Sequence, residues 1–207
     1  HTLMEGLREL RQLRELWNYI DQRDQNMPDV VAKGGAAFGQ PTRQSLEQLF
    51  RNVNVPSRAA VVDMGSGTGT VLFHLAASGI GSSYHGIEFS KPLVDESNLR
   101  RTELELNSPV KFHHENILSL TQDDLLNYAM SYEGTVLPLV IFSFDARMPL
   151  KVVQHIKMLV QGYDVGPITW ITSFNQRDME FLPIPTFMHI GPAGVSENTP
   201  GVLYARA

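Results

Sequence analysis

Residues 59–71 read AAVVDMGSGTGTV, and residues 86–88 read GIE. An apolar run ends in a carboxylate, three glycines follow at alternate positions, and Glu88 comes nineteen residues after Gly69. This order predicts a strand, a tight loop, a helix and a second strand. In a doubly wound sheet, such a unit holds a cofactor that carries adenosine.

The glycines of this loop have a physical role. Because glycine has no Cβ, Gly65, Gly67 and Gly69 can adopt positive φ and let backbone amides come close to a ligand. The predicted helix that follows offers unpaired N–H groups and a partial positive charge at its N-terminus. A carboxylate or phosphate would suit that end.

The glycine spacing distinguishes two kinds of cofactor. A dinucleotide fingerprint, G-x-G-x-x-G, would need a glycine where Thr70 stands, and Asp63 would repel a pyrophosphate. The observed G-x-G-x-G pattern, preceded by Asp63, resembles motif I of the class I S-adenosylmethionine-dependent methyltransferases. That resemblance implies S-adenosylmethionine as cofactor, with its amino-acid end held at Asp63 and the loop residues Ser66 and Thr70 beside it. Glu88 can accept both ribose hydroxyls. The alternative is a glycine-rich turn with two solvated acids.

Composition restricts the class of protein. The chain has 207 residues, 43% hydrophobic and 19% charged, with no cysteine and no apolar run long enough to span a bilayer. These features are typical of a soluble intracellular protein, and they exclude disulfides and thiolate zinc sites. We expect one compact domain, with residues 1–56 as a helical segment with a cofactor-covering loop and residues 57–207 as the core. Because the chain starts with His1, we expect either a domain excised from a longer protein or a chain with added residues at its N-terminus.

The net charge of −5 bears on partners. Proteins that grip nucleic acid by charge alone have a basic balance or a basic patch, which this chain as a whole lacks. The arginines at 8, 11, 14, 100 and 101 are interpreted mostly as solvated helix faces.

Hydrophobic periodicity predicts alternating helices and strands. Helices are predicted over residues 1–20, 43–53, 71–77, 92–106, 125–132 and 150–160. Strands are predicted over residues 59–64, 83–88, 110–114, 136–142, 168–173, 187–190 and 202–205, with 191–201 as a hairpin connection. The predicted fold is therefore a doubly wound, mostly parallel α/β sheet of seven strands with an antiparallel C-terminal hairpin and N-terminal helices, the class I methyltransferase layout.

Two groups of candidate site residues lie at the end of the third predicted strand. His113, His114 and Glu115 invite a metal site, but adjacent strand residues point to opposite faces, so no metal is expected. Asn116, with Ile117 beside it, stands where such methyltransferases often contact the adenine amino group. A loop-capping role for Asn116 is the alternative.

Further candidates follow the fourth and fifth strands, at the sheet edge where ligands of open α/β sheets lie. Phe144 and Phe174 could wall a narrow channel, Asp145 could orient an incoming amine, and Ser173 could add a polar contact. The alternative is a core role for Phe144 and a helix-capping role for Asp145. Because no Asn/Asp-Pro-Pro-aromatic box is present, amino-methylation of nucleobases is disfavoured.

Segments 140–145, 171–174 and 195–204 resemble those of the disruptor-of-telomeric-silencing family, histone-lysine methyltransferases with a class I fold. Phe38, Gly39 and Gln40 sit where that family has an aromatic-Gly-Glu cofactor loop. The resemblance implies a nuclear enzyme that methylates a nucleosomal lysine, with a histone or nucleosome as partner. The chain departs from the family at Gln40, Asn116 and Asp145 and lacks its long basic tail, so DNA contact would be indirect or depend on segments outside this chain.

Amine methylation requires a neutral nitrogen to approach the sulfonium methyl in line, so positioning does most of the catalysis. The cofactor's charge and an apolar channel lower the pKa of a lysine, so no strong base is needed. One rival interpretation is a class I methyltransferase for a small molecule or a non-histone protein. Another is a binding module that keeps the fold without catalysis.

Overall fold

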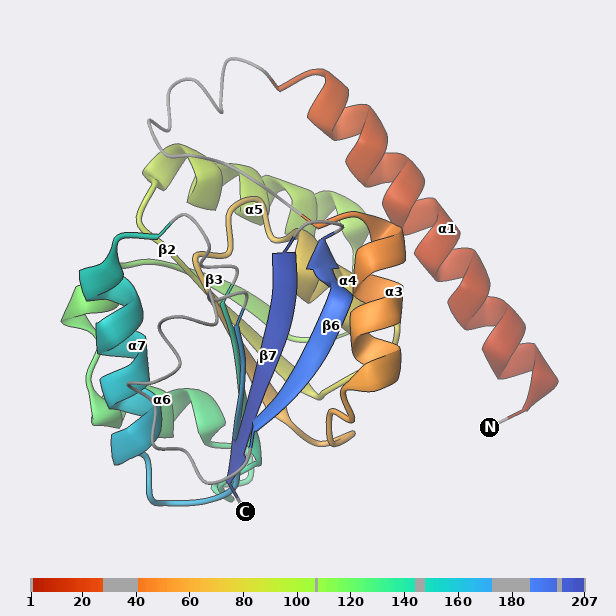
Figure 1. Ribbon diagram of the computed structural model, residues 1–207. Helices are drawn as coiled ribbons and strands as arrows, with labels where there is room; N and C mark the ends of the chain where they lie inside the picture. Colours follow the sequence, from red (N-terminus) through yellow and green to blue (C-terminus); the bar gives the residue numbers. More distant parts are fainter. Residues whose placement is uncertain are drawn as a thin grey trace.

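Five parallel strands form the centre of the protein, seen here in a computed structural model that describes residues 2–27, 41–106, 108–143, 148–172, 187–196 and 199–206 (Figure 1). They are β1 (Ala60–Met64), β2 (Ser83–Glu88), β3 (Val110–His114), β4 (Leu139–Ser143) and β5 (Ile168–Thr172). Their spatial order is β3-β2-β1-β4-β5. The chain therefore runs outward from β1 in one direction and then returns to continue from β4, which confirms the predicted doubly wound parallel sheet.

Two further strands continue the sheet beyond β5. β7 (Thr199–Arg206) pairs antiparallel with β5, and β6 (Phe187–Ser196) pairs antiparallel with β7. Both strands are longer than the predicted runs, so much of the interval 191–201 is strand where a connection was expected. Register shifts between His189, Gly191 and Ser196 let β6 pass through this Gly- and Pro-containing stretch.

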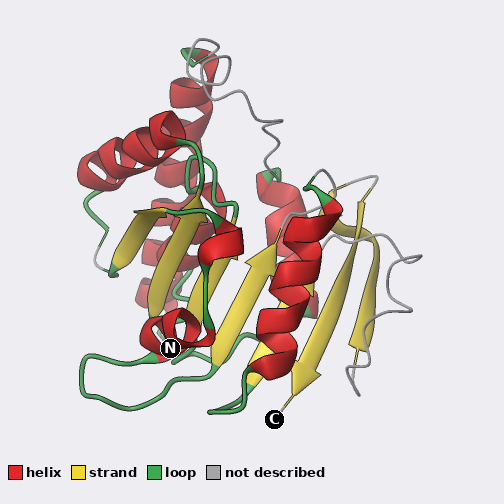
Figure 2. Ribbon diagram, turned by 90° about the vertical axis from the view of Figure 1, so that its left-hand side faces the viewer, coloured by secondary structure: helices red, strands yellow, loops and turns green. Residues whose placement is uncertain are grey.

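Helices cover both faces of the sheet (Figure 2). One face packs against α1 (Leu3–Gln25), α3 (Arg43–Asn52) and α4 (Thr70–Ala77), and the other against η1 (Ile117–Ser119), α6 (Gln122–Ala129) and α7 (Leu150–Gly162). The helix α5 (Lys91–Leu104) lies next to α1, to which its side chains are bonded.

Alternation along β1 explains the two hydrophobic cores. Ala60, Val62 and Met64 belong to the core beneath α6 and α7, whereas Val61 belongs to the core beneath α1, α3 and α4. All five residues of β1 and all five of β4 are buried, as expected for central strands of a sheet covered on both faces.

The N-terminal helix extends beyond its predicted end at residue 20, and only part of it is buried. A capping box between Thr2 and Glu5 begins α1, which extends to Gln25 and buries Leu16, Trp17 and Ile20. Apolar residues nearer the start of the helix stay exposed: Leu3 is 79% exposed and Leu10 is 60% exposed. Only the C-terminal half of α1 therefore packs on the core, and its N-terminal half extends past the rest of the structure (Figure 1).

Other element boundaries also differ from the predictions. β4 begins at Leu139, three residues late, because Val136 forms an isolated bridge with Met130 and Pro138 lies between. The helix α6 begins at Gln122, three residues early, because Thr121 and Asp124 form a capping box. In the part of the chain that the structure describes, no helix is long and apolar enough to cross a membrane.

Candidate cofactor site

The loop between β1 and α4 is tied to the neighbouring strand β2. Its three glycines have φ of 84° at Gly65, 56° at Gly67 and 86° at Gly69, a region that side chains rarely adopt. The amides of Gly65 and Ser66 donate to the carbonyl of Ile87 at 2.7 and 3.0 Å. The predicted strand, tight turn, helix and strand are all present, with Gly69 as the N-cap of α4 and Thr70 as its first residue.

Close packing also requires glycine on this loop. A Cβ on Gly69 would lie 2.6 Å from the Phe112 ring and 2.9 Å from the Phe73 ring. A Cβ on Gly86, opposite Asp63 in the sheet register, would lie 2.6 Å from Ser66 Oγ. The aromatic ring of Phe112 on β3 therefore packs against the loop at Gly69, a contact that the spacing of the glycines in the sequence did not reveal.

Asp63 is a buried carboxyl group near the carboxyl end of β1. Its side chain is 2% exposed, and its Oδ1 has no hydrogen-bond partner among the described residues. Burial, and to a lesser extent the negative charge of Glu88, raises the pKa of Asp63 to about 8. Ser66 Oγ, in the adjacent loop, is likewise buried and unpartnered. A ligand with an ammonium group would supply the positive charge and the hydrogen-bond donor that Asp63 lacks.

Glu88 has a second function besides the predicted ribose contact. Its Oε1 accepts the Gly67 amide at 3.0 Å and its Oε2 accepts the Ser90 amide at 2.8 Å. A carboxylate has about four acceptor positions, so two remain for ribose hydroxyls. Glu88 therefore holds the glycine loop in position and still has acceptor capacity for a ligand.

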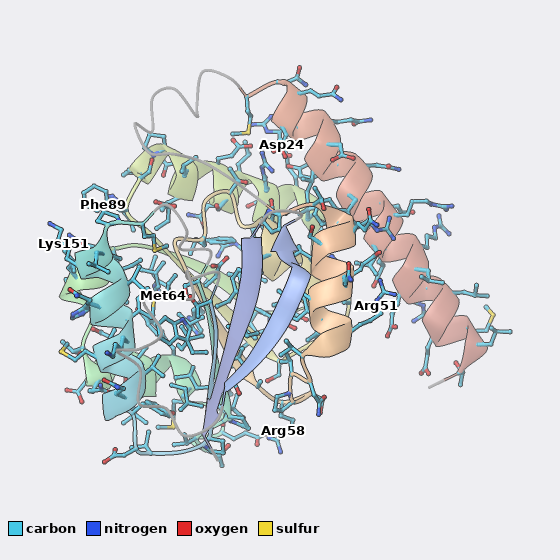
Figure 3. The ribbon with its side chains drawn as sticks, viewed as in Figure 1. Asp24, Arg51, Arg58, Met64, Phe89 and Lys151 are labelled. Atoms are coloured by element: carbon cyan, nitrogen blue, oxygen red, sulfur yellow. The ribbon has the colours of Figure 1, made fainter. Side chains whose placement is uncertain are left out.

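Sequence reasoning missed Phe89, which directly follows Glu88 at the carboxyl end of β2 (Figure 3). Its side chain is 71% exposed although it is large and apolar. His114 Nε2 lies 3.0 Å from the Phe89 carbonyl oxygen and holds the backbone there. The available signal was an aromatic residue immediately after the strand-ending acid.

Asn116 and Ile117 lie just past the end of β3, whose register pairs His114 with Glu88. The Asn116 side-chain oxygen accepts the Leu118 amide at 3.0 Å, which is the capping role considered as the alternative. Ile117 is buried at 9% exposure.

The predicted substrate-side residues follow two adjacent strand ends. Ser143 pairs with Thr172 and with Met64 in the sheet register, so β1, β4 and β5 end side by side. Trp170 Nε1 donates to Ser143 Oγ at 2.8 Å and fixes this corner. The remaining predicted residues lie outside the described part of the chain: Phe38, Gly39, Gln40, Phe144, Asp145, Ser173 and Phe174.

The histidine cluster of β2 and β3 is built differently from the motif considered in the sequence. His113 Nε2 lies 3.1 Å from His85 Nδ1, and both rings pack on Tyr128. Burial lowers the pKa of both imidazoles, that of His85 to about 4. Over the described ranges no group of three or more His, Asp or Glu side chains is arranged to hold a metal.

Comparison with known proteins agrees with this geometry. Residues 56–143 match the family model described as a methyltransferase domain. Human EEF1A lysine methyltransferase 2 is 25% identical over 203 residues, covering 88% of this chain and 82% of that protein.

Solved structures share the fold. TrmK from M. capricolum, solved with S-adenosyl-homocysteine, has a TM-score of 0.53 at 9% identity, covering 80% of this chain and 68% of the other. The RNA methyltransferase from Salinibacter ruber, solved with S-adenosyl-L-homocysteine, has a TM-score of 0.52 at 13% identity, covering 81% and 93%.

The fold and the glycine loop together define a class I methyltransferase domain. The chain is a methyltransferase that uses S-adenosylmethionine. The more specific resemblance to the disruptor-of-telomeric-silencing histone enzymes has no support in these matches. Human EEF1A lysine methyltransferase 2, which aligns with 88% of the chain, is named for a different substrate.

Proposed function

We propose that this protein transfers a methyl group from S-adenosylmethionine to a lysine amine of a protein substrate. The observation that carries the proposal is the alignment with EEF1A lysine methyltransferase 2, which extends over 88% of this chain rather than over the cofactor loop alone. The absence of an Asn/Asp-Pro-Pro-aromatic box after β4 supports it, because such a box would favour nucleobase amines.

We assign the cofactor contacts to groups that still have hydrogen-bond donors or acceptors, or an exposed apolar surface, available for a ligand. Asp63 binds the ammonium group of the cofactor's methionine part, directly or through water. Amides of the glycine loop and the N-terminus of α4 receive its carboxylate. Glu88 accepts the ribose hydroxyls with its remaining lone pairs, and the exposed ring of Phe89 packs on the adenine. Asn116, Ile117 and the segment Phe38-Gly39-Gln40 complete the adenosine contacts.

The reaction needs little covalent help from the chain. When bound, S-adenosylmethionine supplies an electrophilic methyl group: the amine nitrogen bonds to the methyl carbon as the carbon–sulfur bond breaks, and S-adenosylhomocysteine departs. Before transfer, the lysine ammonium releases its proton to solvent. The chain must then bind the neutral amine in line with the methyl group and exclude water. We assign Phe144 and Phe174 as channel walls, Asp145 as the acceptor that orients the amine, and Ser173 as a polar contact.

Two protein substrates are distinguished by experiment. EEF1A is the first to test because the relative's name states it, whereas a histone or nucleosomal lysine is the narrower expectation from segments 140–145 and 171–174. A nuclear location is proposed only with the histone substrate. An enzyme acting on a small molecule remains the alternative.

The labelled-methyl assay decides among them. The purified chain is incubated with methyl-labelled S-adenosylmethionine and, in separate reactions, EEF1A, nucleosomes, free histones and a metabolite extract. We expect label in a protein band and methyl-lysine by mass spectrometry, which Asp145→Ala should diminish. Label confined to the metabolite fraction would overturn the proposal for a protein substrate. Calorimetric titration with S-adenosylmethionine separately tests the alternative of a binding module without catalysis.

We also propose that β6 and β7 complete the seven-stranded sheet of this class as its antiparallel C-terminal hairpin. Residues 1–56 then act with residues 57–207 as one domain. The burial of Leu16, Trp17 and Leu46 in the same core as β1 supports this arrangement.

A further inference from the structure

Arg100 on α5 is fully buried, which contradicts its interpretation as part of a solvated helix face. Its Nη2 donates to Asp24 Oδ1 at 2.7 Å, and its Nε donates to Glu96 Oε1 at 3.1 Å. Glu96, itself 6% exposed, also accepts Arg23 Nε at 2.6 Å and Arg23 Nη2 at 3.0 Å. We name these four residues, Arg23, Asp24, Glu96 and Arg100, the α1–α5 cluster. Figure 3 labels Asp24 at the C-terminal end of α1.

Buried ion pairs contribute little net stability compared with apolar packing, because desolvation offsets much of the attraction. Their contribution is geometric. The planar guanidinium of Arg100 presents its donors in a fixed fork, one side of which is held by Glu96 on the same helix. Asp24 on α1 can therefore bond to Arg100, and Arg23 to Glu96, only when α1 and α5 lie at one position along each other. The cluster therefore fixes the position of α5 relative to α1.

The position of α5 determines how the glycine loop is held. Ser97 lies one turn before Arg100 on the buried side of the helix. Its hydroxyl lies 2.8 Å from the Gly67 carbonyl oxygen and 2.9 Å from the Leu93 carbonyl oxygen, and its single proton can be donated to either. At the start of α5, the Ser90 amide donates to Glu88 Oε2, while Glu88 Oε1 accepts the Gly67 amide. Both the carbonyl and the amide of Gly67 thus depend on groups that α5 places.

We propose that the α1–α5 cluster positions the cofactor loop, so that Arg100, about one helical turn beyond Ser97, sets the affinity for S-adenosylmethionine without touching it. The inference rests on the proposed assignment of the Gly67 loop and Glu88 to the cofactor. It makes the C-terminal half of α1 a working part of the cofactor site. The exposed N-terminal half of α1 does not contribute to the cofactor site.

The test measures binding of S-adenosylhomocysteine by calorimetry to the full chain and to single variants. Arg100→Met, which keeps volume but removes the fork, should raise Kd about tenfold, within the usual range of coupling between sites. Asp24→Asn and Arg23→Gln, both on α1, should raise it by smaller factors. Arg11→Gln removes an ion pair whose side chains are 74% and 60% exposed on the same helix, and should leave Kd unchanged. With saturating cofactor, kcat should be unchanged in all of them.

Reciprocity supplies a second readout that a merely structural role would not produce. If docking of α1 strengthens cofactor binding, cofactor binding must strengthen docking of α1 by the same factor. S-Adenosylhomocysteine should therefore slow amide hydrogen exchange over residues 16–25, with no change over residues 3–10, and Arg100→Met should abolish the slowing.

Unchanged Kd in the folded α1 variants, or no slowing of exchange in the wild type, would overturn the inference. If Arg100→Met does not fold, Asp24→Asn and Arg23→Gln decide the question, because Asp24 is 26% and Arg23 35% exposed. Failure of the wild type to bind S-adenosylhomocysteine would instead count against the cofactor assignment itself.

Discussion

Replacing Asp63 with asparagine should stabilise the free protein while weakening its binding of cofactor. Asp63 is 2% exposed and its pKa is raised from 3.8 to about 8, with burial as the main cause. A group whose pKa is raised in the folded state favours folding below its unfolded pKa, and that contribution is lost as pH rises through the folded pKa. The folded and unfolded pKa values of Asp63 differ by about four units, so the free energy of unfolding falls by an amount on the order of 5 kcal/mol between pH 3.8 and pH 8.

Asparagine has nearly the same shape and no charge, but its buried amide still has a desolvation penalty of about 1–3 kcal/mol. We therefore expect Asp63→Asn to stabilise the free protein at pH 8 by roughly 2–4 kcal/mol, the difference between these two quantities. For a chain of this length that corresponds to a rise in Tm of about 4–16 °C. The advantage should shrink steadily as pH is lowered from about 8 to 5, because the wild-type carboxyl then becomes protonated.

The same substitution should weaken S-adenosylhomocysteine binding by about 10- to 150-fold, the effect of losing a charged hydrogen bond worth about 1.5–3 kcal/mol. Wild-type affinity should also rise about ninefold from pH 6 to pH 7, because binding of an ammonium group requires Asp63 to ionise from a pKa of about 8. Binding at pH 7 should then release about 0.9 proton, measurable by calorimetry in buffers of different ionisation enthalpy.

The assays are urea unfolding from pH 5 to pH 8 without ligand and titration with S-adenosylhomocysteine. Asp95→Asn is the matched control, since it removes one carboxylate whose side chain is 59% exposed on α5 and should change neither property. The reasoning about Asp63 is refuted if Asp63→Asn is less stable than the wild type at pH 8, or if its advantage does not depend on pH.

Three further predictions follow from the same structure. Gly69→Ala and Gly134→Ala both place a side chain at positive φ, but of these two positions only Gly69 has neighbours within 3 Å of the added Cβ. In urea unfolding, Gly134→Ala should lower the free energy of unfolding by about 1–2 kcal/mol. Gly69→Ala should lower it by about 1–3 kcal/mol more and should also abolish cofactor binding. Burial lowers the pKa of His74 to about 4, so the stability that this residue contributes above about pH 6.5 should fall by about 3 kcal/mol as the pH drops to 4. The fall should be smaller in His74→Gln, whose amide oxygen can still accept the hydrogen bond that Trp17 Nε1 donates to His74. Phe89→Ala should raise the Kd for S-adenosylhomocysteine about fivefold through lost stacking, without lowering Tm, since the ring is 71% exposed; an unchanged Kd would remove Phe89 from the site.

The centre of the fold was predictable because its signals are local. Val61, Val62 and their neighbours form a short apolar run that follows Pro56 and ends before Gly65, as expected for a fully covered central strand. The alternate glycines have the positive φ expected of a tight turn that a ligand approaches closely. Here the sequence pattern and the tertiary structure impose the same requirement on the same residues.

The packing of α1 was not predictable, because periodicity shows which face is apolar but not how much of it is covered. Leu10 and Ile20 belong to one helical stripe, yet Leu10 is 60% exposed and Ile20 is fully buried. Coverage depends on the length of the elements that the helix meets, here α4 and α5, and nothing within residues 3–25 encodes that length.

Arg100 and Arg101 show the same limit for charge. They are adjacent in sequence, yet Arg100 is fully buried between two carboxylates while Arg101 donates to the Val110 carbonyl at 3.1 Å. The partners of Arg100 include Asp24, which is 76 residues away in sequence. A run of two arginines on an amphipathic helix carries no information about such a partner, so its burial can be known only from the fold.

Asp63 and Arg100 are both buried ionisable residues, and the difference between them separates the cofactor site from the framework that supports it. Arg100 is bonded to two carboxylates within the protein, so its position is fixed whether or not a ligand is bound. Asp63 Oδ1 has no partner among the described residues, and its raised pKa measures how unfavourable its charge is there. A ligand that brings a positive charge to Asp63 relieves this penalty, so binding and folding are linked, and the protein's stability should rise with ligand concentration as RT ln(1 + [L]/Kd). Ligand-induced stabilisation should therefore be greater at pH 7 than at pH 6 in the wild type and independent of pH in Asp63→Asn, because only the wild type must lose a proton at this carboxyl to bind.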